Sequence, residues 1–282
     1  MPQPQDVLAA AQRPPPLNGA MAPRQTRLLL AGAGGALGAQ VLQRLVASGL
    51  FAHTDVLTRE PMTMALPRVG HLLAAAASPL TAWPVSARPY DVAVVMFEPP
   101  RSFNDRERAF FTPTPEQLPA LAAWLQCCGV RTLVVVLPHA PGRLPDSLKR
   151  GLASLDEQTV ASLGFERVLL VRSAAAPVAT AQGPQTRLLE KLAQWMLSIA
   201  SYMIPATEQP VRPERVAEFV EAALRVLPAG TFVASADLLH RASVGRVALR
   251  ANPKGAITIT QVVHDWLNDQ MIVTGRADAT VA

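Results

Sequence analysis

The segment AGAGGALG, residues 31–38, is the part of this sequence whose residue types and spacing are best suited to chemistry. Its glycines come directly after a short apolar run and directly before an amphipathic stretch. Glycine permits a tight turn and lets a ligand approach the peptide N–H groups, and the dipole of a following helix favours an anion. The pattern predicts a bound pyrophosphate, with a glycine-rich turn that binds nothing as the alternative. Gly34 and Gly35 are expected to let the phosphates approach, Gly32 to permit the turn and Gly38 to let the helix sit against the strand. The residues expected to form the binding loop are Gly32, Gly34, Gly35, Ala36, Leu37 and Gly38.

The residues after the second expected strand bear on which dinucleotide is bound. This position meets the adenosine ribose about 20 residues beyond the glycines, and here it holds Thr58, Arg59 and Glu60. Arg59 suits the 2′-phosphate of NADP and can stack on adenine. A shift of one residue would present Glu60 to the ribose 2′-hydroxyl of NAD instead. The sequence favours NADP as the cofactor, with NAD as an alternative, and Arg59 as a solvated loop residue is a third interpretation.

The elements that must position these residues follow from the hydrophobic pattern. Short apolar runs alternate with amphipathic stretches, which is typical of a parallel sheet buried on both faces. We expect an α/β fold with a doubly wound parallel sheet and a smaller C-terminal helical lobe. The expected strands are residues 27–31, 55–58, 91–97, 132–137 and 167–171, with a further strand somewhere in 69–84. The expected helices between them are residues 37–46, 115–128 and 155–163.

Three regions are expected along the chain. Residues 1–25 are proline-rich and should form a disordered tail, and Met21 is an alternative natural start. Residues 26–177 are the expected nucleotide-binding core. The alternation ends beyond Pro177, so residues 178–282 are expected to form a helical lobe for a substrate or a partner. Its expected helices are residues 185–202, 213–226 and 260–271, and its extended pieces are residues 231–234 and 256–260.

Composition excludes several classes of protein. Half of the residues are hydrophobic and 17% are charged, so the bulk of the chain is not intrinsically disordered. No apolar run is long enough for a membrane span. The net charge is +5, but the arginines are scattered and aromatic residues make up 5%, which argues against nucleic-acid binding. Cys127 and Cys128 cannot form a disulfide framework, and no histidine has metal-ligand spacing. With no secretory h-region, a cytoplasmic location is expected.

Several motifs together resemble the atypical short-chain dehydrogenase/reductases, the NmrA-like group included. They are the glycines at residues 32, 35 and 38, LTR at residues 57–59, GFERVLLVR at residues 164–172 and VRPERVAEFVEAAL at residues 211–224. The resemblance implies a Rossmann domain with NAD(P) along the carboxyl ends of its strands. It places Phe97 and Glu98 near the adenosine, and Leu137, Pro138 and His139 near the nicotinamide.

Catalytic members of that family use a tyrosine with a lysine four residues further on. The two tyrosines of this chain are followed at that spacing by Val94 and Ala206, so the pair is absent. His139 is the candidate replacement acid, with Arg172 or Arg143 to hold an oxyanion. A structural or exposed histidine is the alternative interpretation.

Two functions therefore compete. In the first, the protein is an NADPH-dependent oxidoreductase that acts on an unknown small molecule. In the second, it holds NADP(H) without chemistry, as a redox sensor or an accessory subunit. A nucleotide-free scaffold is a third possibility, because fold alone does not fix function.

An insertion, EPPRSFNDRERAFFTPTPE at residues 98–116, follows the fourth strand and combines charged residues with phenylalanines. Loops in this position often carry function. It could be a lid over the cofactor, a partner-binding face, or a short charged helix whose phenylalanines pack inward.

Overall fold

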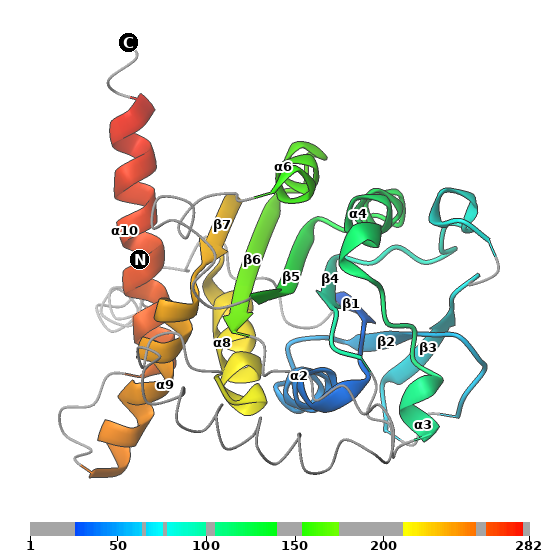
Figure 1. The fold of residues 1–282 in the computed structure, drawn as a ribbon, viewed down its shortest axis with the longest axis horizontal. Coiled ribbons are helices and arrows are strands. Elements are labelled where there is room, and N and C mark those ends of the chain that lie inside the picture. The colour runs from blue at the N-terminus through cyan, green and yellow to red at the C-terminus, as the bar shows by residue number, and fades with distance from the viewer. Residues whose placement is uncertain are drawn as a thin grey trace, which may run out of the picture.

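The computed structural model describes residues 26–63, 66–75, 78–99, 105–139, 154–174, 211–251 and 258–278. A seven-stranded sheet in the order β3-β2-β1-β4-β5-β6-β7 forms its centre (Figure 1). Every neighbouring pair is parallel. This order is that of the doubly wound Rossmann fold, so the expected fold class is confirmed. The strands are β1 Arg27–Ala31, β2 His53–Thr58, β3 Val69–Leu73, β4 Val92–Met96, β5 Thr132–His139, β6 Arg167–Ala174 and β7 Gly230–Ala234.

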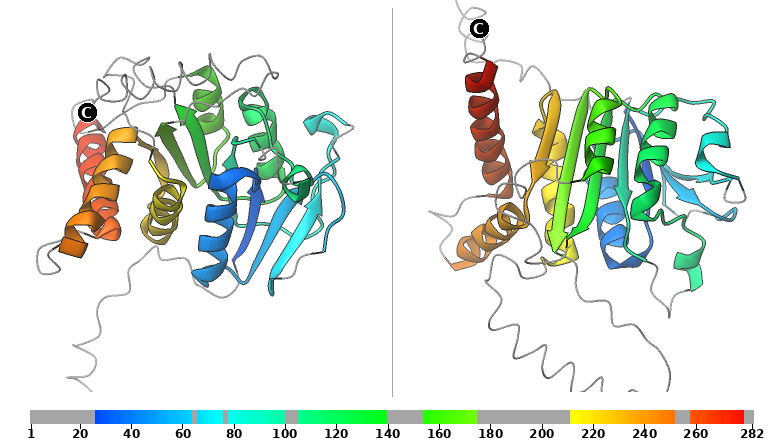
Figure 2. Two further views of the ribbon diagram at one scale, coloured as in Figure 1. Left: turned by 60° about the horizontal axis from the view of Figure 1, so that its bottom comes forward. Right: turned by 45° about the horizontal axis from the view of Figure 1, so that its top comes forward.

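Helices cover both faces of the sheet, as Figures 1 and 2 show. One face is covered by α2 Gly35–Ala47 and α8 Pro213–Val226, with α9 Ala236–Ala251 and α10 Ile259–Asp278 packed beyond α8. The other face is covered by α4 Leu118–Cys127, α6 Leu155–Ser162 and the 3₁₀ turn η1 Leu80–Ala82, and the 3₁₀ turn η2 Pro115–Gln117 leads directly into α4. The short helix α3 Asp105–Arg108 stands apart from both layers.

Strands β1, β2 and β4 bury both of their faces, which explains why the sequence shows apolar runs there rather than alternation. The edge strand β3 is buried only in part, and its Leu73 is 51% exposed. In β1, Leu28 and Leu30 belong to the core under α2, whereas Leu29 and Ala31 belong to the core under α4. All four side chains are at most 1% exposed. Burying a leucine side chain stabilises the fold by about 1.5–3 kcal/mol, so β1 contributes to two cores at once.

The last part of the sheet lies in the region that the sequence assigned to a separate lobe. β7 pairs with β6 from Gly230 to Ala234, and α8 packs against α2. An ion pair of 2.5 Å joins Arg44 of α2 to Glu221 of α8. Residues 211–234 thus extend the Rossmann sheet and its helical layer, and α9 and α10 pack against α8 with side chains in the same core.

Several expected elements differ from the structure or lie outside it. Strand β2 begins at His53, two residues earlier than expected, and β5 and β6 run on to His139 and Ala174. The third strand is β3, inside the expected range. Helix α10 begins at Ile259, where an extended piece was expected. The expected tail at residues 1–25 and the expected helix at residues 185–202 lie outside the described residues. Within the described residues, no helix has the length and apolar character needed to cross a membrane.

Candidate functional site

The turn between β1 and α2 has the backbone geometry of an anion-binding loop. Gly32 and Gly35 have φ of +79° and +75°, values that glycine adopts far more readily than other residues. A Cβ on Gly32 would overlap the Met96 carbonyl oxygen, and one on Gly38 would overlap the Gly32 carbonyl oxygen. Gly34 is the N-cap of α2 with an ordinary φ of −72°. The loop therefore brings bare backbone to the carboxyl edge of the sheet, where Rossmann folds bind ligands.

Two carboxylates of the chain itself occupy the N–H groups of this loop. The Gly35 N–H donates to Glu107 Oε2 at 2.9 Å, and the Leu37 N–H donates to Glu98 Oε2 at 2.5 Å. Helix α2 has no side-chain N-cap bond and no acidic residue in its first turn. Its N-terminal N–H groups and its dipole thus find their negative partners elsewhere in the chain. The expectation that these N–H groups stand open is wrong for this conformation.

The segment that supplies Glu107 covers the end of β2. We call residues 105–111 the covering segment; it includes α3 and an antiparallel bridge between Phe110 and Thr58. Its backbone bonds are Phe111 N–H to Leu57 O at 2.9 Å, Arg59 N–H to Ala109 O at 2.7 Å and Gly32 N–H to Phe111 O at 2.9 Å. It therefore lies over the position expected for the adenosine ribose. Of the three interpretations of the insertion, the short charged helix whose phenylalanines pack inward matches the structure, because α3 has the sequence DRER, Phe111 is buried and Phe110 packs against the core.

The covering segment is also packed inward. Glu107 is 4% exposed. The Phe111 ring is buried edge-on to Trp83, with ring centroids 5.1 Å apart. Thr58 Oγ1, opposite Phe110 in the bridge, and Thr112 Oγ1, next to Phe111 in the chain, are buried and have no hydrogen-bond partner within the described residues. Two buried hydroxyls without partners are a cost of this closed arrangement.

The residues expected near the adenosine are placed as follows. Thr58 is fully buried at the end of β2, while Arg59 is exposed and its guanidinium lies 6.0 Å from the centre of the Phe111 ring. Phe97 is buried in the core on the α4 side, and Glu98 turns to α2. Of these four residues, Arg59 is the exposed one.

The residues expected near the nicotinamide lie at the ends of β5 and β6. Leu137 is half-buried, and His139 is the last residue of β5, beside Ala174 of β6. The side chains of Pro138 and His139, and the whole of Arg143, lie outside the described part of the chain.

Arg172 does not have the role expected for it. Its guanidinium donates to Glu157 Oε2 at 2.7 Å, and both side chains are at least nine-tenths buried. The arginine is held in an ion pair between β6 and α6 and does not face an oxyanion. The sequence could not show this pairing, because Glu157 reads there as an ordinary first-turn residue of a helix.

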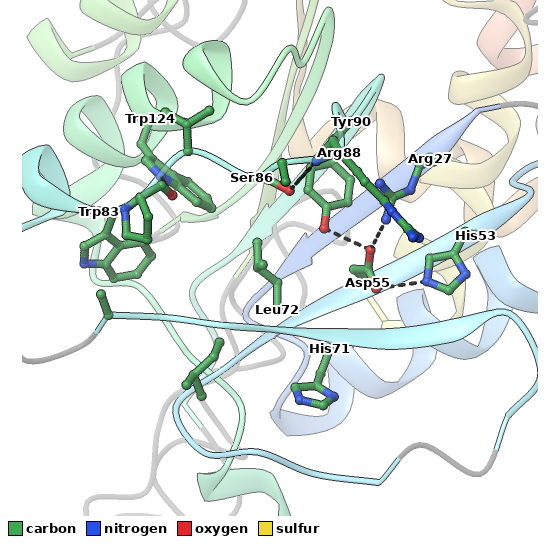
Figure 3. Close-up of a pocket in the computed structure, with 15 residues that line it drawn as sticks. Arg27, His53, Asp55, His71, Leu72, Trp83, Ser86, Arg88, Tyr90 and Trp124 are labelled. Atoms are coloured by element: carbon green, nitrogen blue, oxygen red, sulfur yellow. Dashed lines mark hydrogen bonds and ion pairs between the residues drawn. The ribbon is translucent and has the colours of Figure 1, made fainter.

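A second polar cluster lies at the opposite edge of the sheet, around a cavity of about 440 Å³ (Figure 3). Asp55 accepts from the Tyr90 hydroxyl at 2.9 Å and from Arg27 Nη2 at 2.7 Å, and His53 Nε2 lies 3.0 Å from its other oxygen. Arg27 and His53 begin β1 and β2, so this cluster marks the amino ends of the strands. Burial and the neighbouring Asp55 raise the pKa of Tyr90. Tyr90 is therefore neutral, held in place and remote from the glycine loop.

Sequence reasoning missed this cluster, although a signal existed. Asp55 is a charged residue directly before Val56 and Leu57 in a buried strand, and a buried carboxylate requires partners. A Cβ on Gly70 of β3 would overlap Asp55 Oδ1, so glycine at that position leaves room for the carboxylate. In the part of the chain that is described, no group of three histidine, cysteine, aspartate or glutamate side chains is arranged to hold a metal ion.

No family model matches the chain, and no curated protein does. Solved structures similar to it include a Rossmann-fold NAD(P)-binding family protein from Shigella flexneri, 13% identical over 73% of this chain and 93% of that chain, with a TM-score of 0.41. Uronate dehydrogenase from Agrobacterium tumefaciens is 16% identical over 75% of this chain and 77% of that chain, with a TM-score of 0.41. Bordetella bronchiseptica WbmF in complex with NAD+ is 12% identical over 91% of this chain and 96% of that chain, with a TM-score of 0.41. At these identities and TM-scores the fold assignment rests on the strand order and not on these proteins.

Proposed function

We propose that this protein binds an NAD(P)(H) dinucleotide at the glycine loop and holds it without hydride transfer, as a redox sensor or an accessory subunit. The observation that carries the proposal is that the N–H groups of Gly35 and Leu37 already bind negatively charged oxygens. A phosphate oxygen makes the same demand on these groups as a carboxylate oxygen. The loop and the first turn of α2 would hold the pyrophosphate. When bound, the nicotinamide would supply hydride transfer, provided that a suitable acid lay beside it.

NADP is the dinucleotide that we propose. Arg59 is exposed at the end of β2, and its cation suits a 2′-phosphate. The adjacent Glu60 is exposed too, and its carboxylate suits the ribose hydroxyl of NAD. The preference for NADP over NAD therefore depends on which of these two side chains faces the ribose. The glycine pattern, together with the lack of a Tyr-Lys pair, fits an atypical, NmrA-like short-chain reductase.

The tyrosines support a role without turnover. The sequence contains no tyrosine followed four residues later by lysine. Tyr90 donates its hydroxyl to Asp55 at the amino edge of the sheet, so it cannot protonate a substrate at the carboxyl edge. One observation favours the oxidoreductase instead. His139 ends β5 at the carboxyl edge, where a nicotinamide-proximal acid would be needed.

Titration of the purified protein with NADPH and NADH, followed by fluorescence, tests the proposal. We expect saturable NADPH binding and no oxidation of NADPH with a panel of quinones, aldehydes and enones. Turnover that is lost in His139→Ala would establish the oxidoreductase instead. Gly34→Val is the matched loop variant: the φ of Gly34 is open to valine, so the fold should survive while the side chain blocks the phosphates. Unchanged affinity in Gly34→Val would contradict binding at this loop.

A further inference from the structure

We propose that the covering segment and Glu98 form a built-in competitor for the dinucleotide, so that the ligand binds only when two carboxylates leave the glycine loop. This inference rests on the proposed function and concerns the regulation of the same site. It starts from the two bonds that end on loop N–H groups, Gly35 to Glu107 and Leu37 to Glu98.

Charge and position make these contacts competitive. Both carboxylates accept from the first turn of α2, where a pyrophosphate would also accept. Each N–H group has one hydrogen to donate, and two anions cannot share the position without strong repulsion. The carboxylates must therefore withdraw before phosphate oxygens can bind.

The covering segment blocks the adenosine position as well as the pyrophosphate position. Its backbone bonds to Leu57, Arg59 and Gly32 occupy the end of β2 and the start of the loop. Removal of Glu107 from the loop and release of the β2 end are thus parts of one movement, because α3 and the bridge at Phe110 are joined by a single residue.

The contacts that hold the segment closed are of a reversible kind. Within the described residues they include backbone hydrogen bonds, one antiparallel bridge, the packing of Phe110 and Phe111, and further interactions of Glu107 and Arg108. Thr58 Oγ1 and Thr112 Oγ1 have no hydrogen-bond partner within the described residues. Opening lets water or a ligand pair with both hydroxyls, which offsets part of the cost of exposing Phe111. In a segment that stayed closed permanently, we would expect both buried hydroxyls to have hydrogen-bond partners.

The test compares wild-type protein with Glu107→Ala, Glu98→Ala and the double variant, with NADPH and inorganic pyrophosphate as probes in calorimetry. A charge-assisted hydrogen bond corresponds to about 10- to 100-fold in an equilibrium constant, so we expect each single variant to bind both probes at least about 10-fold more tightly. Glu116→Gln is the matched control, since it removes a charge from the same insertion at an exposed residue away from the loop, and its affinity should equal that of wild type. If Glu107→Ala fails to fold, Glu107→Gln keeps the shape of the side chain and removes its charge.

Hydrogen exchange without ligand supplies a second readout. The peptides that cover residues 32–38 and 105–111 should be protected in the wild type and exchange together, and faster, in the variants. Equal NADPH affinity in the wild type and the carboxylate variants would overturn the competition and leave the proposed function intact. Fast exchange of the loop in the wild type would also overturn it. If no form binds NADPH although exchange shows the loop released in the double variant, the proposed function is overturned, and the competition falls with it.

Discussion

The Tyr90 hydroxyl donates to Asp55 Oδ2 at 2.9 Å, and this bond ties the segment before β4 to the middle of β2. The same carboxylate also binds Arg27, whose guanidinium lies 4.8 Å from the centre of the Tyr90 ring. The tyrosine is thus part of the support of the sheet at its amino edge. Its role there is structural, at the edge opposite the glycine loop.

A pH dependence of stability follows from this bond. Burial and Asp55 raise the pKa of Tyr90 above its ordinary value of about 10, so the folded protein holds the phenolic proton more tightly than the unfolded chain. This contribution to stability is complete below about pH 10 and is lost as the pH rises further. Denaturant unfolding between about pH 8 and pH 11 should show stability falling more steeply in the wild type than in Tyr90→Phe. Equal slopes would contradict the raised pKa.

A position can require glycine because its φ is positive or because a Cβ has no space. A matched pair of alanine variants separates these two requirements. Gly32 and Gly49 both have positive φ, but only at Gly32 would a Cβ meet backbone, whereas at Gly49 nothing lies within 4 Å. Gly49→Ala should cost about 1–2 kcal/mol for the left-handed conformation. Gly32→Ala should cost about 1–3 kcal/mol more because the chain must move. Free energies of unfolding test this, and equal losses would contradict the close packing of β1 against β4.

Arg59 should discriminate between the two dinucleotides. Arg59→Ala should weaken NADPH binding by about 1–3 kcal/mol, the range of a charge-assisted contact, and leave NADH binding nearly unchanged. Arg131→Ala is the matched control, because it removes the same charge from an exposed residue just before β5, at the amino edge. Calorimetric titrations with both nucleotides make the comparison. Equal losses for NADPH and NADH would refute the 2′-phosphate role.

The ion pair between Glu157 and Arg172 should matter for stability in proportion to its burial. Glu157→Gln removes the charge that faces a buried guanidinium and should lower the free energy of unfolding by about 3 kcal/mol. Glu166→Gln is the control, because Glu166 pairs with Arg167 at 2.8 Å while its side chain is 45% exposed. A surface pair of that kind contributes about 0–1 kcal/mol. Similar small losses in both variants would show that Arg172 is not held by Glu157.

Local features of the sequence were sufficient to predict β1, β2, β4, β5 and β6, whereas they placed β3 only somewhere in residues 69–84. Runs such as VVV at residues 134–136 are buried on both faces and read as central strands of a parallel sheet. The sequence predicts the residues of β7 only as an extended piece of a separate lobe. β7 is a short edge strand, and its pairing with β6 is decided by the return of the chain and not by its own composition.

The glycine loop was predicted correctly as a strand–turn–helix junction because its requirement is local. Positive φ at Gly32 and Gly35 and close packing at Gly38 act between residues near in sequence or in adjacent strands. The role expected for Arg172 was wrong, since its pairing with Glu157 joins two different elements. The placement of Asp55 beneath Tyr90 was missed for the same reason.

The sequence by itself determined that a Rossmann sheet forms and that a bare helix N-terminus meets its carboxyl edge, since apolar runs and glycines act through their immediate neighbours. Only the tertiary structure decided what lies against that helix. Glu107 reaches Gly35 across 72 residues of chain, and Glu98 reaches Leu37 across 61. An unsatisfied N–H group and a dipole attract any carboxylate that the fold brings near, and which one arrives depends on the path of the chain.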